Sequence, residues 1–383
     1  MSVTAAAGFR AAGVRAGLKA SGNHDVALVV NDGPSKAASA VFTRNRFQAA
    51  PVKWTQQCVT DGRIDAVVLN SGGANACTGP QGFQDTHRTA EHVALVLGIS
   101  ALDVAVCSTG LIGELLPMQA LLTGVDSAAS VLSSTGGADA ALAIMTTDSV
   151  SKTSVVVKGG VTIGGMAKGA GMLAPGLATM LVVISTDAVL DAGVLDSALR
   201  DAVSTTFDRV DSDGCMSTND TVLLMASGAS GVVPSTSDFA EALHEVCADL
   251  ARQLVADAEG ASKDIRIHVI NAASVDDAVD VARAVSRSNL LKCAIHGEDP
   301  NWGRVLSAAG TTAAVFQPDD VCVAINDVWV CLNAAPHADR GLVDMSGRDV
   351  VITVDLAAGT DHATLWTNDL TADYVHENSA YST

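Results

Sequence analysis

The sequence predicts a mixed α/β fold, in which short strands alternate with amphipathic helices. The chain has 383 residues, more than one hydrophobic core usually accommodates, so we expect two lobes or interleaved layers. Hydrophobic residues make up 48% of the chain, but aromatic residues only 3%. The core must therefore be built mainly from Ala, Val, Leu and Ile in closely spaced layers, which suits an α/β protein.

Five short segments rich in β-branched and apolar residues predict strands. The last two are separated by Gly159-Gly160, which favours a tight hairpin turn because glycine adopts positive φ angles without steric cost. This hairpin leads directly into a glycine-rich segment. The predicted strands are Asp25–Val30, Ile64–Leu69, Asp103–Cys107, Val155–Lys158 and Val161–Gly165.

Five longer segments place apolar residues three and four positions apart, which is the period of an amphipathic helix. Turn-rich stretches at Ser134–Gly137, Gly228–Asp238 and Ala335–Gly341 separate some of them, but composition does not change enough there to define a domain boundary. The predicted helices are Thr86–Leu97, Met118–Leu132, Asp191–Phe207, Phe239–Ala258 and Val275–Ser288.

Charge and hydropathy argue against several classes of protein. With 42 acidic and 23 basic residues, the net charge of −19 disfavours binding to nucleic acid or anionic lipid. This charge favours cationic small substrates, or serves only to keep the protein soluble. The longest apolar run, near Leu177–Ile184, is too short to span a bilayer, and the first residues lack a secretory signal. We therefore expect a cytoplasmic protein.

The eight cysteines form no C-x-x-C pair, which argues against a zinc site and against a dense disulfide framework. We expect reduced thiols in the core. The stretch Arg209–Asp220 has the wrong first and last residues for a calcium loop, and neither H-E-x-x-H nor G-x-S-x-G occurs. We therefore expect neither a metal ion nor a cofactor. The cysteines lie at positions 58, 77, 107, 215, 247, 293, 322 and 331.

A glycine-rich segment, Gly164–Thr179, runs into the apolar residues Met180–Ile184 and predicts a loop that feeds a buried strand. It matches neither a Walker loop nor a dinucleotide-binding turn. Its glycines and Pro175 permit an unusual backbone, in which the Thr179 hydroxyl could attack the carbonyl of Ala178. Hydrolysis of the resulting ester would free an α-amine with a pKa of about 7.7–8.0, able to activate the hydroxyl. The alternative is an ordinary buried threonine at the start of a strand.

Two further polar segments combine hydroxyl or amide side chains with glycines. Cys107–Gly113 follows a predicted strand and could form an oxyanion hole, because its backbone N–H groups can approach a ligand closely. Asn70–Ala76 is of the same kind. The alternative is an ordinary strand-to-helix connection capped by Ser or Thr.

Ten short motifs carry a family resemblance that spans nearly the whole chain. They are Gly8–Gly13, Val41–Asn45, Asn70–Gly79, Cys107–Gly113, Ala143–Asp148, Lys168–Leu181, Ser217–Thr221, Asp257–Gly260, Asp299–Arg304 and Glu377–Tyr381. In this order they resemble the ornithine acetyltransferase (glutamate N-acetyltransferase) family of arginine biosynthesis, particularly its actinobacterial members. The resemblance implies a layered αββα sandwich with two lobes, of the self-processing N-terminal-nucleophile type.

The resemblance also implies a precursor that breaks between Ala178 and Thr179. Residues 1–178 would form an α chain and residues 179–383 a β chain, which share one fold and assemble as α2β2. The implied reaction is ping-pong: N-acetylornithine acetylates Thr179, and glutamate then accepts the acetyl group to form N-acetylglutamate. Acetyl-CoA is a candidate second donor, and the implied enzyme is an amino-acid acyltransferase.

By the same resemblance, Thr109 and Gly110 would supply the oxyanion hole. Lys168 would pair with a substrate carboxylate, and Glu259 would attract the ornithine ammonium. The chain departs from the family at Gly176, where many members have Asn, and at the last residue, where Ser can replace Thr383. The residues expected around the substrate are Thr146, Lys168, Thr179, Glu259, Asn378 and Thr383.

Two other functions agree with the same residues. A self-processing hydrolase of the aminopeptidase or amidase type would pass the acyl group to water rather than to glutamate. A non-catalytic amino-acid-binding protein would use the glycine-rich loops to hold its ligand and would keep one intact chain. Product analysis separates the first alternative from acetyl transfer, and the mass of the purified chain separates the second.

Overall fold

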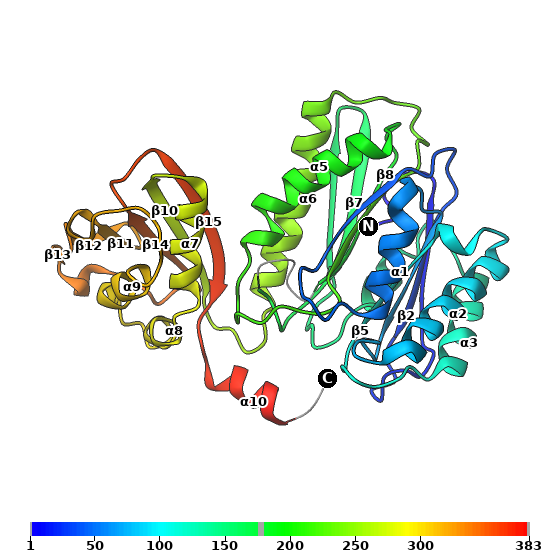
Figure 1. The fold of residues 1–383 in the computed structure, drawn as a ribbon, viewed down its shortest axis with the longest axis horizontal. Helices are drawn as coiled ribbons and strands as arrows, with labels where there is room; N and C mark the ends of the chain where they lie inside the picture. The colour runs from blue at the N-terminus through cyan, green and yellow to red at the C-terminus, as the bar shows by residue number, and fades with distance from the viewer. Residues whose placement is uncertain (1, 175–179, 381–383) are drawn as a thin grey trace.

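The computed structural model describes residues 2–174 and 180–380, which form a larger and a smaller lobe (Figure 1). Strands in these described residues make three sheets, two in the larger lobe and one in the smaller. The predicted mixed α/β class is therefore confirmed.

The first sheet of the larger lobe has the strand order β1-β2-β4-β5, in which β4 and β5 are parallel and the other pairs antiparallel. Every residue of β2, β4 and β5 is buried. This explains why the strands begin as continuous apolar runs without a polar alternation, at Val26–Val30, Ala66–Leu69 and Val104–Cys107. The strands are β1 (Phe9–Val14), β2 (Val26–Asn31), β4 (Ala66–Ser71) and β5 (Val104–Thr109).

The second sheet has the order β3-β9-β8-β7-β6, in which β8 and β9 are parallel and the other pairs antiparallel. The predicted β6–β7 hairpin is confirmed: Lys158 pairs with Val161, and both Gly159 and Gly160 have positive φ angles. The strands are β3 (Ala38–Phe42), β6 (Lys152–Lys158), β7 (Val161–Lys168), β8 (Leu181–Thr186) and β9 (Thr221–Ala226).

The side chains of β8 alternate between two cores and so define the stacking of the layers. Leu181 and Val183 pack in the core of the four-stranded sheet, whereas Val182 and Ile184 pack in a second core with the helices α5 and α6. A strand places successive side chains on opposite faces, so one sheet can serve both cores. The layer order is helix, sheet, sheet, helix, as expected for an αββα sandwich (Figure 1).

Helices cover the outer faces of both sheets. α5 and α6 lie on the five-stranded sheet and α2 and α3 on the four-stranded sheet, while α1 packs beside β5 (Figure 1). No helix of the described residues is long and apolar enough to cross a membrane. The helices are α1 (Ala50–Cys58), α2 (Gly79–Leu97), α3 (Met118–Ser130), α4 (Gly137–Ala143), α5 (Ala192–Thr205) and α6 (Thr236–Ala256).

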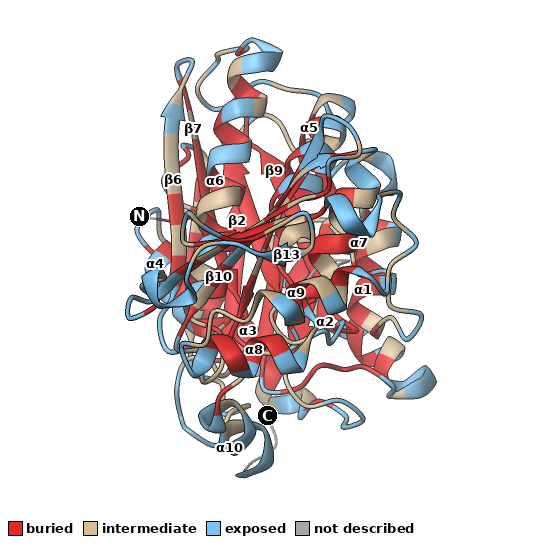
Figure 2. Cartoon of the chain, turned by 90° about the vertical axis from the view of Figure 1, so that its left-hand side faces the viewer, coloured by how far each residue is buried: buried red, intermediate tan, exposed pale blue. Residues whose placement is uncertain are grey.

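The smaller lobe has its own core and a sheet of order β13-β12-β11-β14-β10-β15. In β10, Ile265, Ile267 and Val269 are buried while Arg266 is exposed, so one face of this sheet meets the helices (Figure 2). The elements are β10 (Asp264–Ala272), α7 (Val275–Ser286), α8 (Asn289–His296), α9 (Trp302–Ala309), β11 (Cys322–Ile325), β12 (Val328–Leu332), β13 (Ala335–Pro336), β14 (Asp349–Asp355) and β15 (Asp361–Asn368).

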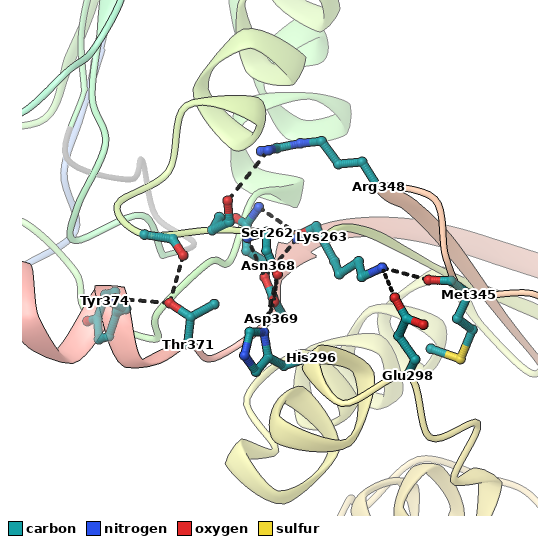
Figure 3. Close-up of polar contacts among 12 residues, drawn as sticks. Ser262, Lys263, His296, Glu298, Met345, Arg348, Asn368, Asp369, Thr371 and Tyr374 are labelled. Atoms are coloured by element: carbon teal, nitrogen blue, oxygen red, sulfur yellow. Dashed lines mark hydrogen bonds and ion pairs between the residues drawn. The ribbon is translucent and has the colours of Figure 1, made fainter.

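Asp369 joins the two chain segments that connect the lobes (Figure 3). Its Oδ1 accepts the backbone N–H groups of Ser262 and Lys263, each at 2.9 Å, and its Oδ2 lies 2.9 Å from the Nδ1 of His296. Thr371 donates its hydroxyl to the carbonyl oxygen of Gly260 at 2.7 Å. These bonds fix the loop after α6 beside the segment that leads into α10 (Ala372–Ala380).

The predicted strands and helices are confirmed, and most ends are shifted by only a few residues. However, α2 begins at Gly79, seven residues before the predicted Thr86, and two other predicted boundaries are wrong. Gly164–Lys168 forms the end of β7 rather than the start of a loop. Glycine is needed there because a Cβ on Gly164 would lie 2.3 Å from the carbonyl oxygen of Ser2. The turn predicted to reach Asp238 ends earlier, because Ser235 accepts the N–H of Asp238 and caps α6.

The cysteines are free thiols, and all eight lie in the described part of the chain. The prediction that they are core thiols holds for Cys58, Cys107, Cys247 and Cys331, which are buried. It is wrong for the exposed residues Cys77, Cys215 and Cys293, and Cys322 is half-buried.

Replacement of Leu223 by Ala tests the core between the stacked sheets, because this β9 side chain is fully buried there. We expect the free energy of unfolding to fall by about 2–5 kcal/mol, measured from the denaturant midpoint. Val157→Ala is the control, since that side chain is exposed and should change stability by less than about 0.5 kcal/mol. Equal effects of the two substitutions would contradict this packing.

Candidate active site

A pocket of about 240 Å³ lies where β5 and β7 end. The structure brings together in its wall six of the predicted site residues, which come from widely separated parts of the chain. Ala178, Thr179 and Thr383, which complete the predicted set, lie outside the described residues, as does Gly176. The six residues in the wall are Thr109, Gly110, Thr146, Lys168, Glu259 and Asn378.

The two stacked sheets meet at this pocket. Thr109 is the last residue of β5 in the four-stranded sheet, and Lys168 is the last residue of β7 in the five-stranded sheet. The Lys168 ammonium donates a hydrogen bond of 3.3 Å to the Thr109 hydroxyl. The packing of one sheet on the other therefore determines where these two side chains lie.

The backbone at Gly110 is held in a conformation that favours glycine. Its φ angle is +130°, and a Cβ at this position would lie 2.6 Å from the backbone nitrogen of Gly73. Gly72 and Gly73 donate their N–H groups to the carbonyl oxygen of Thr109 at 2.9 and 3.0 Å. The peptide groups around Thr109 and Gly110 are thus fixed before a substrate arrives, which an oxyanion hole requires.

Lys168 is a buried cation, only 2% exposed. Burial lowers the pKa of its ammonium, and the carboxylate of Asp148 opposes that effect. Within the described residues the ammonium forms no ion pair, and it donates a hydrogen bond to the Thr109 hydroxyl. A buried cation that is free of a direct carboxylate partner can bind an anionic group of a ligand.

Glu259 lies in the loop after α6 and holds two other parts of the pocket. Its Oε1 accepts the hydroxyl of Thr147 at 2.7 Å, and its Oε2 accepts the side-chain amide of Asn378 at 2.9 Å. Its backbone N–H donates to the carbonyl oxygen of Ala170 at 3.0 Å. The pocket therefore combines a buried ammonium with a carboxylate, which suits a ligand that carries both charges.

Sequence reasoning assigned no role to several residues of the pocket. Asn219 donates its side-chain amide to the carbonyl oxygens of Ala74 at 2.6 Å and Ser108 at 2.7 Å, so it ties the start of β9 to the end of β5. The sequence feature that could have indicated these residues is the run of four polar residues Ser217–Asp220 directly before the buried strand β9. The unassigned residues are Ala74, Leu111, Ile112, Thr147, Gly171, Met172, Ser217, Thr218 and Asn219.

Asp220 is a fully buried acid that sequence reasoning also left without a role. Burial raises its pKa well above the ordinary value, against the effect of hydrogen bonds from Met180 and other groups. Its Oδ1 accepts the Met180 N–H at 3.1 Å, so this acid holds the backbone next to the predicted nucleophile. The described residues contain no group of three or more His, Cys, Asp or Glu that could hold a metal ion.

A sequence profile of the ArgJ family matches residues 10–383. The chain belongs to the ArgJ family. It is 68% identical to the arginine biosynthesis bifunctional protein ArgJ of Streptomyces avermitilis and 63% identical to that of Thermobifida fusca, with 100% of both chains covered in each comparison. A solved structure of ornithine acetyltransferase complexed with ornithine from Mycobacterium tuberculosis is 56% identical over 47% of this chain and 96% of that chain, with a TM-score of 0.43.

Membership of the ArgJ family confirms the predicted family. It also confirms the prediction of an acetyltransferase of arginine biosynthesis.

Replacement of Gly171 by Ala tests the position of the Glu259 carboxylate in this ArgJ-family pocket. A Cβ on Gly171 would lie 2.6 Å from both carboxylate oxygens, so the flexible Glu259 side chain must move away. We expect acetyl transfer to fall at least about tenfold, which corresponds to ~1.4 kcal/mol of lost transition-state stabilisation. The melting temperature should change little.

Gly347→Ala is the matched control, because a Cβ there meets no atom within 4 Å. Equal transfer rates in the two variants would show that the position of Glu259 does not matter.

Proposed function

We propose that this chain moves an acetyl group from N-acetylornithine to glutamate through an acetyl-Thr179 intermediate. The observation that carries the proposal is the pocket in which the fixed Thr109–Gly110 backbone, the buried Lys168 ammonium and the Glu259 carboxylate surround one cavity. Membership of the ArgJ family supports the same reaction.

The nucleophile arises by cleavage of the bond between Ala178 and Thr179. The Thr179 hydroxyl attacks the Ala178 carbonyl carbon, and the peptide nitrogen leaves as the α-amine of Thr179. Water then hydrolyses the ester, which leaves Ala178 as a carboxyl terminus and restores the hydroxyl. The new amine can accept the hydroxyl proton near neutral pH, because an α-amine has a pKa of about 7.7–8.0.

Acetyl transfer then proceeds in two steps. The Thr179 oxygen attacks the acetyl carbonyl of N-acetylornithine, the carbon–nitrogen bond breaks, and ornithine leaves with the proton on its amine. The amine of glutamate next attacks the acetyl ester and regenerates the hydroxyl. Thr109 and Gly110 stabilise the oxyanion in both steps, an effect of about 2.7–4 kcal/mol for one donor where it has been measured.

Charge recognition selects the substrates. The Lys168 ammonium pairs with the α-carboxylate, and Glu259 attracts the side-chain ammonium of ornithine, because each is opposite in charge to the group it binds. Glutamate carries a carboxylate where ornithine carries the ammonium, so Glu259 favours the ornithine substrates. Thr146, Asn378 and Thr383 complete the contacts with the substrate.

The α chain of residues 1–178 and the β chain of residues 179–383 remain associated and pair as α2β2. The association within one αβ unit is supported by the five-stranded sheet, in which β7 precedes the cleaved bond and its partner β8 follows it. Acetyl-CoA is proposed as a second acetyl donor rather than as a resident cofactor. We place the reaction in the cytoplasm.

Mass spectrometry of freshly purified protein tests the cleavage. We expect two fragments of similar size, the second beginning with Thr179. Thr179→Ala should give one uncut chain and no acetyl transfer, because it lacks the attacking hydroxyl. Thr179→Ser should retain part of both activities, since serine keeps that hydroxyl.

The products distinguish the proposal from its alternatives. An intact wild-type chain that transfers no acetyl group would favour a binding protein. A cleaved enzyme that releases acetate from N-acetylornithine at an undiminished rate without glutamate would favour a hydrolase.

Replacement of Glu259 by Gln tests the selection of ornithine. We expect KM for N-acetylornithine to rise by about tenfold or more while KM for glutamate changes little, because only ornithine loses an opposite charge. Glu245→Gln on the exposed surface of α6 is the control and should leave both values unchanged. An equal rise for both substrates would refute this role of Glu259.

A further inference from the structure

A buried ionic cluster lies directly behind the pocket. The Lys152 side chain has no exposed surface, and its ammonium donates to Asp148 at 2.6 Å and to Asp257 at 2.5 Å. A third, longer bond of 3.4 Å reaches the carbonyl oxygen of Val150. All three ammonium hydrogens therefore have acceptors, and Lys152 is fully used within the cluster.

Asp148 holds the backbone of two segments that line the pocket. Its Oδ1 accepts the N–H of Gly169 at 2.6 Å, in addition to the Lys152 ammonium, and its Oδ2 accepts the N–H of Thr146 at 2.9 Å. Gly169 follows Lys168 directly, and Thr146 itself lines the pocket. Asp148 therefore fixes the backbone of two segments of the pocket wall, one of which carries Lys168.

Asp257 connects the cluster to the loop that carries Glu259. It accepts the N–H of Ser149 at 3.1 Å and also the Ser149 hydroxyl, and it lies two residues before Glu259. The cluster thus joins residues that precede the proposed cleavage bond to residues that follow it.

The charges around Lys168 come from several elements. A buried ammonium without counter-charge would lose its proton, so these surroundings decide whether Lys168 can bind a carboxylate. Asp148, Asp220 and Glu259 favour its protonated form and Lys152 opposes it, with burial as the largest effect. Lys19, whose ammonium donates to the carbonyl oxygen of Met145, is a further cation nearby.

Asp148 is the strongest of the opposing charges, yet it does not occupy Lys168. Its two oxygens are bonded to Lys152 and to the backbone N–H groups of Gly169 and Thr146. A direct ion pair would compete with the ligand, whereas a fixed carboxylate at longer range supplies charge and leaves the ammonium free.

We propose that Asp148 is the positioning residue that keeps Lys168 cationic and free for a substrate carboxylate, and that Lys152 and Asp257 hold Asp148 in place. The inference rests on the proposed role of Lys168 in binding that carboxylate. It assigns to the cluster an electrostatic task that a merely structural salt bridge would not perform.

The pH dependence of kcat/KM for N-acetylornithine tests the inference. Burial already lowers the Lys168 pKa, and removal of the Asp148 charge lowers it further, so Asp148→Asn should move the alkaline limb to lower pH by about one unit. Most of the loss in kcat/KM of Asp148→Asn should come from a higher KM rather than from a lower kcat. Lys152→Met removes a cation that lowers the same pKa, while the N–H groups of Gly169 and Thr146 still hold Asp148, and should therefore move the limb to higher pH.

The double variant Asp148→Asn, Lys152→Met removes one charge of each sign and should return the limb close to its wild-type position. If the cluster had only a structural role, all three variants would lose activity, and their alkaline limbs would not shift in opposite directions. Asp126→Asn, on the exposed surface of α3, controls for loss of a carboxylate and should leave the profile unchanged.

The outcomes distinguish failure of the proposed function from failure of the inference about Asp148. A wild-type enzyme without acetyl transfer would overturn the proposed function. A wild-type enzyme that transfers, together with a folded Asp148→Asn variant whose alkaline limb does not move, would overturn the inference alone. If Asp148→Asn fails to fold, Lys152→Met decides: a limb at higher pH supports the inference, and an unmoved or lower limb refutes it.

Discussion

The side chains of β8 point alternately into two cores, and this alternation positions the rest of the larger lobe. Leu181 and Val183 pack against the four-stranded sheet, while Val182 and Ile184 pack under α5 and α6. Because each face must meet a different layer, a register shift of one residue would exchange the two cores. The stacking that results brings the ends of β5 and β7 together, and with them Thr109 and Lys168.

A layered core with few aromatic residues also permits buried charge. Small and branched side chains let sheets and helices approach closely, so backbone N–H groups reach buried carboxylates: two bond to Asp148 and one bonds to the Oδ1 of Asp220. Both oxygens of Asp148 have partners, whereas the Oδ2 of Asp220 has none among the described residues. Each of these acids binds backbone beside the pocket rather than the ligand. Buried polar groups with full sets of partners hold a single geometry, whereas a missing partner would cost about 1–3 kcal/mol.

Sequence patterns predicted part of the fold, namely five of the strands and five of the helices, and the family resemblance pointed to six of the residues that line the pocket. Apolar runs identified β2 and β5 because both strands are buried on each face, and the family motifs brought Thr109, Lys168 and Glu259 into one site. The roles of Asp148 and Asp220 could not be predicted in the same way. Lys152 links Asp148 to Asp257, which is distant in the chain, and the proximity of the two acids depends on how α6 packs against β6.

The same packing bears on the proposed cleavage between residues 178 and 179. β7 and β8 are adjacent antiparallel strands, paired from Ile163 with Thr186 to Lys168 with Leu181, and this ladder does not depend on the connection between them. Once formed, it holds the two ends in register, while Lys152 joins carboxylates from both sides of the bond. Cleavage can therefore release a terminal amine without releasing the pocket, because Lys168 is held on β7 and Glu259 follows α6, so neither charge depends on the cleaved bond.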